Sequence, residues 1–206
     1  MDYNFSYVFT IFFMLLGPIK LIPSFAGLTR GADARFKRDV AVRGVVVASV
    51  LCAFVALAGG TLLSKYRISI DALRISGGLV LLIAALQVIF RKAEYSSPSS
   101  DAPAAIQLAA SPLAVPMIVP PAGVAAILIF MMFEPAHPKI LTTIAVCLAI
   151  MMVLDLLVMY FIDKVTKIPG LMIVLTVLGS VLIFVQVALA MEMFLTALKS
   201  LGVIRV

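Results

Sequence analysis

Residues 44–63 read GVVVASVLCAFVALAGGTLL and contain no charged side chain. A transmembrane helix needs about 20 predominantly apolar residues to cross the hydrocarbon core of a bilayer, and this run has that length. A second run, from Ile168 to Met191, is also free of charge. The two runs predict an integral membrane protein.

The composition of the whole chain agrees with this prediction. Apolar residues make up 64% of the 206 positions, charged residues make up 13%, and the mean hydropathy is +1.20. A soluble domain is nearer half apolar and a quarter charged, because a surface so poor in charge would expose large apolar patches to water. The net charge of +6 is spread over short loops, a pattern typical of membrane orientation signals and not of a nucleic-acid-binding face.

Six apolar runs predict six transmembrane helices, so the expected fold class is an all-α membrane protein with a single transmembrane domain, 1–206. A Ser/Pro-rich polar loop at 91–103 divides the domain into halves of three spans each, 1–92 and 105–206. The expected spans are residues 5–28, 40–63, 69–90, 105–133, 139–163 and 170–197.

The first span of each half is interrupted by glycine and proline, in LLGPIKLIPSF at 15–25 and in SPLAVPMIVPPAG at 111–123. Proline removes a backbone N–H and clashes with the preceding turn, and the polar groups freed in this way cannot face lipid. Matched interruptions in two halves are typical of a transporter whose substrate binds near the midplane. The residues expected to bind substrate are Gly17, Pro18, Lys20, Pro23, Pro116, Pro120, Pro121 and Gly123.

Three spans per half require the second half to cross the membrane in the opposite direction, so the sequence predicts an inverted repeat. The small residues Gly77, Gly78 and Gly179 occupy comparable places in the third and sixth spans and are expected to allow close helix packing. An alternative stays open, in which the proline breaks are packing kinks without a role in transport.

Charged side chains within the spans are candidate functional residues, because they are costly in lipid. Lys20 and Asp155 are expected at similar depth, and pairing them would relieve two burial penalties. A Lys20 ammonium that reaches the membrane surface is the competing interpretation. Arg74 and Glu192 form a second group near the outer surface, where Asp71 can also pair with Arg74, and an interfacial salt bridge is favoured there.

Enzymatic signatures are missing from the sequence, which has no HExxH, GxSxG or GxxxxGK[ST] motif. The single histidine, His137, lies in a loop, and the two cysteines lie in apolar runs, so neither a metal site nor another cofactor is expected. Gln87 and Gln186 are expected to form hydrogen bonds between helices or to contact substrate. The bilayer and a small-molecule substrate are the expected partners, and homo-oligomerisation stays open.

The basic residues indicate an orientation. The first loop carries Arg30, Arg35, Lys37, Arg38 and Arg43, and lysine and arginine are most abundant in cytoplasmic loops. Both termini are therefore predicted to lie outside the cytoplasm.

The sequence resembles a known family through five ordered elements, found at 17–23 (GPIKLIP), 30–43 (RGADARFKRDVAVR), 73–78 (LRISGG), 112–122 (PLAVPMIVPPA) and 190–199 (AMEMFLTALK). These elements are similar to those of the MarC family of bacterial inner-membrane proteins, which is grouped with neutral amino-acid transporters. The resemblance implies six spans in the inner membrane. It also implies a secondary transporter or exporter of small neutral amino acids or related molecules. Because the sequence has no ATP-binding motif, an ion gradient of protons or sodium, or simple exchange, is the expected source of energy.

Two departures from the family pattern involve three residues. Lys20 replaces a small glycine, and Pro120 with Ala122 replaces the glycines that flank a proline in the second break. Both changes fall where close approach of the backbone to substrate is expected. Substrate choice in this member is therefore left open, as is a non-transporting role in assembly or sensing.

Overall fold

The computed structural model describes residues 5–90, 105–132 and 139–204, and all regular secondary structure in these ranges is helical. The polar loop expected at 91–103 and His137 lie outside the described residues. The helices are α1 (Phe5–Leu16), α2 (Pro18–Leu28), α3 (Ala34–Lys65), α4 (Ile70–Phe90), α5 (Ala105–Leu108), the π-helical η1 (Ala109–Ile118), α6 (Pro121–Met131), α7 (Ile140–Tyr160), α8 (Ile162–Val165) and α9 (Leu171–Ser200).

The helices supply five or six candidate membrane spans. Five stretches are long and apolar enough to cross a bilayer, namely Phe5–Leu28, α3, Ile70–Gln87, α7 and α9. The pair formed by Ala105–Ile118 and Pro121–Met131 is bent by 59° and makes a sixth if it is one broken span. The predicted fold class, an all-helical membrane protein with about six spans, is confirmed at this level.

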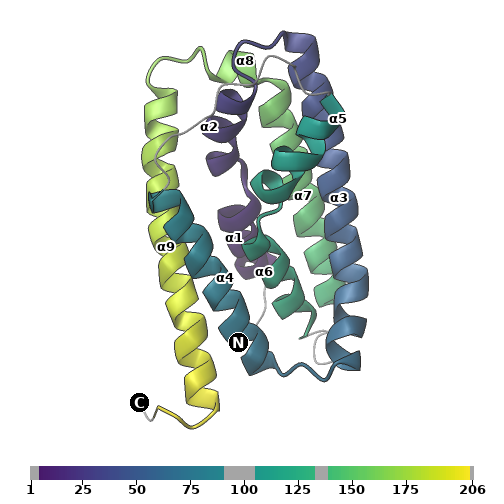
Figure 1. Cartoon of the computed structure of the whole chain (residues 1–206), viewed down its shortest axis with the longest axis vertical. Coiled ribbons are helices and arrows are strands. Elements are labelled where there is room, and N and C mark those ends of the chain that lie inside the picture. The colour runs from purple at the N-terminus through teal and green to yellow at the C-terminus, as the bar shows by residue number, and fades with distance from the viewer. Residues whose placement is uncertain (1–4, 91–104, 133–138, 205–206) are drawn as a thin grey trace.

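The broken helices lie inside the bundle, between two pairs of long helices (Figure 1). On one side α4 packs along α9, and on the other side α3 packs along α7. Helices α1 and α2 contact α7 and α9, while η1 and α6 contact α3. Helix α1 begins and α9 ends at the same end of the bundle (Figure 1), as an even number of spans requires.

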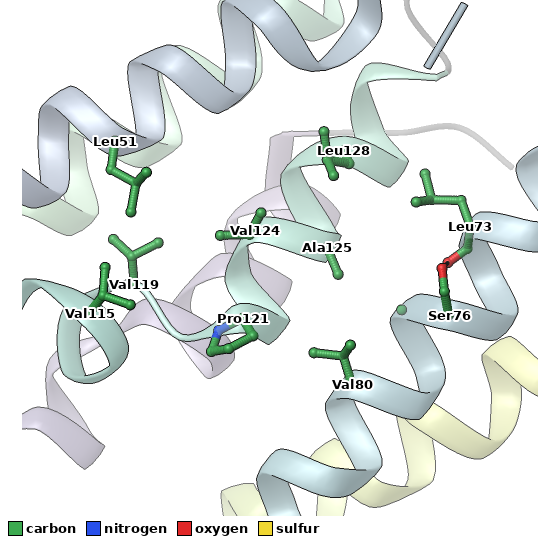
Figure 2. A pocket seen from close by; sticks show the side chains of 11 residues that line it. Leu51, Leu73, Ser76, Val80, Val115, Val119, Pro121, Val124, Ala125 and Leu128 are labelled. Carbon is green, nitrogen blue, oxygen red and sulfur yellow. Dashed lines mark hydrogen bonds between the residues drawn. The ribbon is translucent and has the colours of Figure 1, made fainter. Parts of the chain in front are cut away.

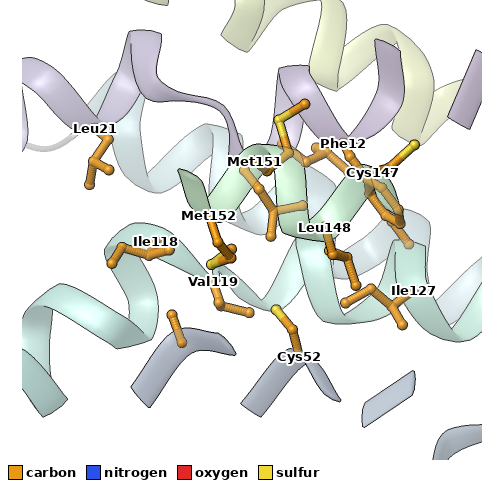
Figure 3. Packing of buried hydrophobic residues seen from close by; sticks show 14 of the residues in the cluster. Phe12, Leu21, Cys52, Ile118, Val119, Ile127, Cys147, Leu148, Met151 and Met152 are labelled. Carbon is orange, nitrogen blue, oxygen red and sulfur yellow. The ribbon is translucent and has the colours of Figure 1, made fainter. Parts of the chain in front are cut away.

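The packed core lies around the two broken segments. Phe12 of α1, Ile118 of η1, and Cys147 and Met151 of α7 are completely buried, and they belong to one apolar cluster with Cys52 of α3 (Figure 3). Helix α9 instead turns large apolar side chains outward, and only 11% of its most apolar window is buried. In water such a surface would be costly, whereas a bilayer accommodates it.

The second span begins earlier than the expected position 40, because Asp33 caps the helix. The Asp33 carboxylate accepts a hydrogen bond from the backbone N–H of Phe36 at 3.3 Å, and α3 begins at Ala34. Aspartate is a favoured N-cap residue because it satisfies an N–H that the first turn leaves unpaired. The basic residues expected in a loop therefore lie mostly on the first turns of α3.

Two of the three glycines expected to pack helices do so. A Cβ atom at Gly78 would lie 3.0 Å from the carbonyl oxygen of Ala190 on α9, and one at Gly77 would lie 3.0 Å from Met193 Cε. For Gly179 the packing role stays a prediction, because the residue is buried but no atom of the described residues lies within 4 Å of its Cβ position. The close approach of α4 to α9 in the described residues occurs where Gly78 meets Ala190.

We expect Gly78→Ala to lower the free energy of unfolding by about 1–3 kcal/mol, the usual cost of overpacking a tight interior. The atom that the new methyl group meets belongs to the backbone and cannot rotate away. Thermal unfolding in detergent, followed by circular dichroism, measures the effect. Gly60→Ala on α3 is the matched control, because its new Cβ would meet only Met131 Cε at 3.8 Å among the described residues, and it should leave the midpoint unchanged or slightly raised. Equal loss in both variants would contradict the assigned helix contact.

Candidate functional site

The first break is centred on Gly17. Its backbone is extended, at φ −71° and ψ 164°, and it forms the N-cap of α2, with Pro18 in the first turn. Its N–H donates to the carbonyl oxygen of Phe13 at 3.0 Å, and a Cβ at this position would collide with that same oxygen. Glycine is thus required here by a close backbone contact, and proline is suited to the start of α2 because its missing N–H is not needed there.

The second break follows η1. Ser111 and Val115 adopt extended backbone angles inside η1, each directly before a proline, because the proline ring disfavours helical geometry in the preceding residue. Pro120 is also extended, at φ −68° and ψ 156°, and caps α6, which begins at Pro121. As at Gly17, the break ends with the N-terminus of a new helix.

The two breaks, together with α4 and α9, line a half-open cavity of about 430 Å³, here called the Lys20 cavity. Its volume falls in the range of about 300–1,000 Å³ typical of small-molecule sites. Five of the eight residues expected to bind substrate line it, from both breaks. The lining residues are Leu15, Gly17, Lys20, Ser24, Val80, Ile83, Ala84, Gln87, Pro116, Met117, Pro120, Pro121, Ile183 and Gln186.

Lys20 extends from α2 toward α9, where its ammonium donates to Gln186 Oε1 at 3.1 Å. The Gln186 amide in turn donates to the carbonyl oxygen of Leu81 on α4 at 3.1 Å. Gln186 is buried, so the expectation that it forms hydrogen bonds between helices is confirmed. The chain of two bonds fixes the Lys20 head group at the wall of the cavity, which disagrees with a side chain that reaches the membrane surface.

Comparison with known protein families gives one match along nearly the whole chain. The family model described as MarC family integral membrane protein matches residues 3–201. The chain belongs to the MarC family.

Similar curated proteins carry the family's other name. A UPF0056 membrane protein of Archaeoglobus fulgidus is 25% identical over 57% of this chain and 57% of its own length. One of Pyrococcus horikoshii is 26% identical over 69% and 71%. The UPF0056 inner membrane protein YhgN of Escherichia coli K12 is 26% identical over 56% of this chain and 58% of its own length. No solved structure matches.

Three of the eight residues expected to bind substrate lie outside the Lys20 cavity. Pro18 is buried within α2, and Pro23 lines a separate cavity of about 400 Å³ near Thr29 and Asp163. A Cβ at Gly123 would lie 3.2 Å from Leu16 Cγ, so this glycine allows α6 to pack closely on the end of α1. These residues shape the breaks without contacting the cavity.

The sequence analysis missed Ser24, which lines the Lys20 cavity and donates a hydrogen bond to the carbonyl oxygen of Lys20 at 3.1 Å. A sequence signal was available, because residues four apart on a helix share a face. Met117 also lines the cavity and carried no comparable signal, since the irregular backbone of η1 removes the helical periodicity.

The expected pair of Lys20 with Asp155 is not formed. Asp155 on α7 is completely buried, and neither carboxylate oxygen has a hydrogen-bond partner among the described residues. The sequence indicated depth along parallel helices but not which face each side chain occupies. Lys20 faces α9 and is satisfied by Gln186, so the two charges lie on different faces of the core.

The second expected group is partly confirmed. Arg74 Nη1 lies 3.1 Å from Asp71 Oδ1 in an ion pair within α4. Glu192 accepts a hydrogen bond from Thr196 at 3.4 Å and lines, with Arg74, a cavity of about 170 Å³. We call it the Arg74 cavity. The similar depth of Arg74 and Glu192 is thus confirmed, whereas the ion pair of Arg74 is made with Asp71.

A further cavity of about 380 Å³ lies between α3, α4, η1 and α6 (Figure 2). Its one polar side chain is Ser76, and the other side chains around it, such as Leu51, Val119 and Leu128, are apolar. Val80 and Pro121 separate it from the Lys20 cavity, since they line both. Because it offers no charged group, the Lys20 cavity is the better candidate site for a polar substrate.

We expect Asp155→Leu to preserve or raise the stability of the protein. A buried polar group without a partner costs about 1–3 kcal/mol, and an apolar side chain of similar size removes that cost. The midpoint of thermal unfolding in detergent measures it. Asp163→Leu is the control, because it breaks the 2.6 Å ion pair with Lys37 and should not raise the midpoint. A large loss in Asp155→Leu would contradict the unpaired state of this carboxyl group.

Proposed function

We propose that this MarC protein is a secondary transporter or exporter of small molecules that carry a carboxylate, with small neutral amino acids as the class that the family resemblance implies. The observation that carries the proposal is the Lys20 cavity, which is lined by both helix breaks and by a cationic side chain. Broken backbone at membrane depth is tolerated where it lines a cavity, and discontinuous helices are a common way to build a transporter site.

The same proposal includes an inverted repeat of two three-helix halves. It is supported by the pairing of corresponding helices, since α3 packs on α7 and α4 packs on α9. The broken helices of the two halves both contribute their interrupted segments to the Lys20 cavity. In such a repeat the substrate site lies at the interface between halves.

We place the protein in the bacterial inner membrane, following its relative YhgN, which is named an inner membrane protein. We also propose that both termini lie outside the cytoplasm. Lys37, Arg38 and Arg43 lie on the first turns of α3, at the end of the bundle opposite to the start of α1 and the end of α9 (Figure 1). The excess of basic residues in cytoplasmic loops supports this orientation.

A path to the site is suggested by Leu15, which lines both the Lys20 cavity and the Arg74 cavity. Leu15 is 3% exposed and belongs to the last turn of α1, directly before the break at Gly17. In the proposed carrier, a movement of this turn connects the two cavities. The polar groups of Arg74 and Glu192 then form the outer approach to Lys20.

The transport proposal is tested by uptake into proteoliposomes. We expect saturable uptake of at least one labelled compound from a panel of glycine, alanine and lactate, and a dependence on an imposed proton or sodium gradient. Lys20→Met should change that uptake, because it removes the charge that lines the cavity. Lys65→Met, at an exposed position at the end of α3, is the control. No uptake by folded protein across the panel would favour the non-transporting role in assembly or sensing.

Solvent access separates the same alternatives without a known substrate. In a background with Cys52 and Cys147 replaced by alanine, Ser24→Cys should react with a water-soluble maleimide, because a carrier site must be reached by water. Adding Leu15→Ala should increase the rate. Ala48→Cys, at a completely buried position on α3, should stay unreactive. A packing kink predicts that the cysteine at position 24 is as protected as the one at position 48.

A further inference from the structure

We propose that the Lys20 cavity selects small monocarboxylates over zwitterionic amino acids, and this inference rests on the proposed function of the same cavity. The family resemblance implies neutral amino acids, whereas Lys20 stands at a position where the family pattern has glycine. The two substrate classes differ in the ammonium group, so the selectivity of the cavity between them depends on which charged side chains face it.

Among the described residues that line the cavity, Lys20 is the one that is charged. Its described hydrogen-bond acceptor is the neutral amide oxygen of Gln186, so the positive charge has no counter-charge at this contact. An ammonium carries three N–H donors, and one of them is used by Gln186. The other two have no acceptor within the described part of the chain, and a carboxylate offers both the oxygens and a negative charge.

The acidic residues in the described part of the chain are placed elsewhere. Asp71, Asp39 and Asp163 form ion pairs with Arg74, Arg43 and Lys37. Asp33 caps α3, Glu192 lines the Arg74 cavity, and Asp155 has no hydrogen-bond partner. Since none of them lines the Lys20 cavity, an ammonium group bound there would meet no negative charge from the described residues.

The ends of two helices add to the positive character of the cavity. Helices α2 and α6 are 11 residues long and both begin there, since Gly17, Pro120 and Pro121 line the cavity. A helix N-terminus carries about half a positive charge and favours anions. The amino group of alanine would therefore be repelled by the same groups that attract its carboxylate, and the lining side chains that could accept from it are the neutral Ser24, Gln87 and Gln186.

The remaining wall suits a short apolar body. Leu15, Val80, Ile83, Ala84 and Ile183 surround the polar groups, and replacing water there with a methyl or ethyl group is favourable. A hydroxyl or keto group next to the carboxylate can still use Gln87 or Ser24. Lactate and similar short acids combine these features.

The test uses four compounds with the same three-carbon skeleton and different charges. These are lactate as the anion, lactamide as the neutral form, alanine as the zwitterion and alaninamide as the cation. Binding to the purified full-length protein in detergent is measured by titration calorimetry, and thermal stabilisation by each compound supplies a second measurement. We expect lactate to bind at least about tenfold more tightly than alanine, because unlike and like charges at a partly buried ammonium differ by at least this factor.

Variants at Lys20 test the cause of this preference. Lys20→Met should remove the advantage of lactate over lactamide, and Lys20→Glu should reverse the order so that alaninamide binds best. Lys65→Met, at the exposed end of α3, should bind like the wild type. Size-exclusion profiles confirm that each variant is folded, and if Lys20→Glu does not fold, Lys20→Met decides alone.

Alanine binding as tightly as lactate, unchanged lactate affinity in Lys20→Met, or no binding by the folded wild type would each overturn the inference. Its failure can be told apart from failure of the transport proposal. Lactate binding that depends on Lys20 without uptake into liposomes would leave the anion site standing and remove the carrier. Uptake of alanine without any preference for lactate would leave the carrier standing and remove the anion selectivity.

Discussion

The fold depends on one constraint, namely that backbone polar groups inside a bilayer must be satisfied within the protein. Gly17, Ser111, Val115 and Pro120 all leave helical geometry, and each departure releases hydrogen-bonding groups. The structure places these departures in the interior, between the α3–α7 pair and the α4–α9 pair (Figure 1). The long helices with regular backbones face the lipid instead, and their apolar outer surfaces cost nothing there.

The membrane class and the helical spans could be predicted from the sequence, because apolar runs such as Gly44–Leu63 have only one stable environment. The positions of the breaks could also be predicted, since proline and glycine act locally. Five of the predicted site residues line one cavity for this reason. The partner of Lys20 could not be predicted, because periodicity along a broken helix does not determine which way a side chain turns. The packing role of Gly78 could be predicted only in part, since the sequence marks a small residue but not the partner, Ala190, that it approaches.

Lys20 and Asp155 show two ways of placing a charged residue within a span. The Lys20 ammonium lies at a cavity and is held by Gln186, so that part of its burial cost is offset by a hydrogen bond and by room for water or a ligand. Asp155 is completely buried without a hydrogen-bond partner among the described residues. A buried polar group without a partner costs about 1–3 kcal/mol, and the stability of the Asp155→Leu variant is therefore a direct measure of how this carboxyl group is accommodated.

The close backbone contact between Gly78 and Ala190 also limits the motions open to the bundle. Two helices that contact each other through their backbones cannot slide past each other without separating, so we expect α4 and α9 to move together as a rigid pair. The Gln186 bond to Leu81 joins the two helices again about one turn closer to the N-terminus of α9. The Lys20–Gln186 bond then links this helix pair to α2. In the proposed carrier, a solute that replaces Gln186 at the Lys20 ammonium would release α2 from the pair.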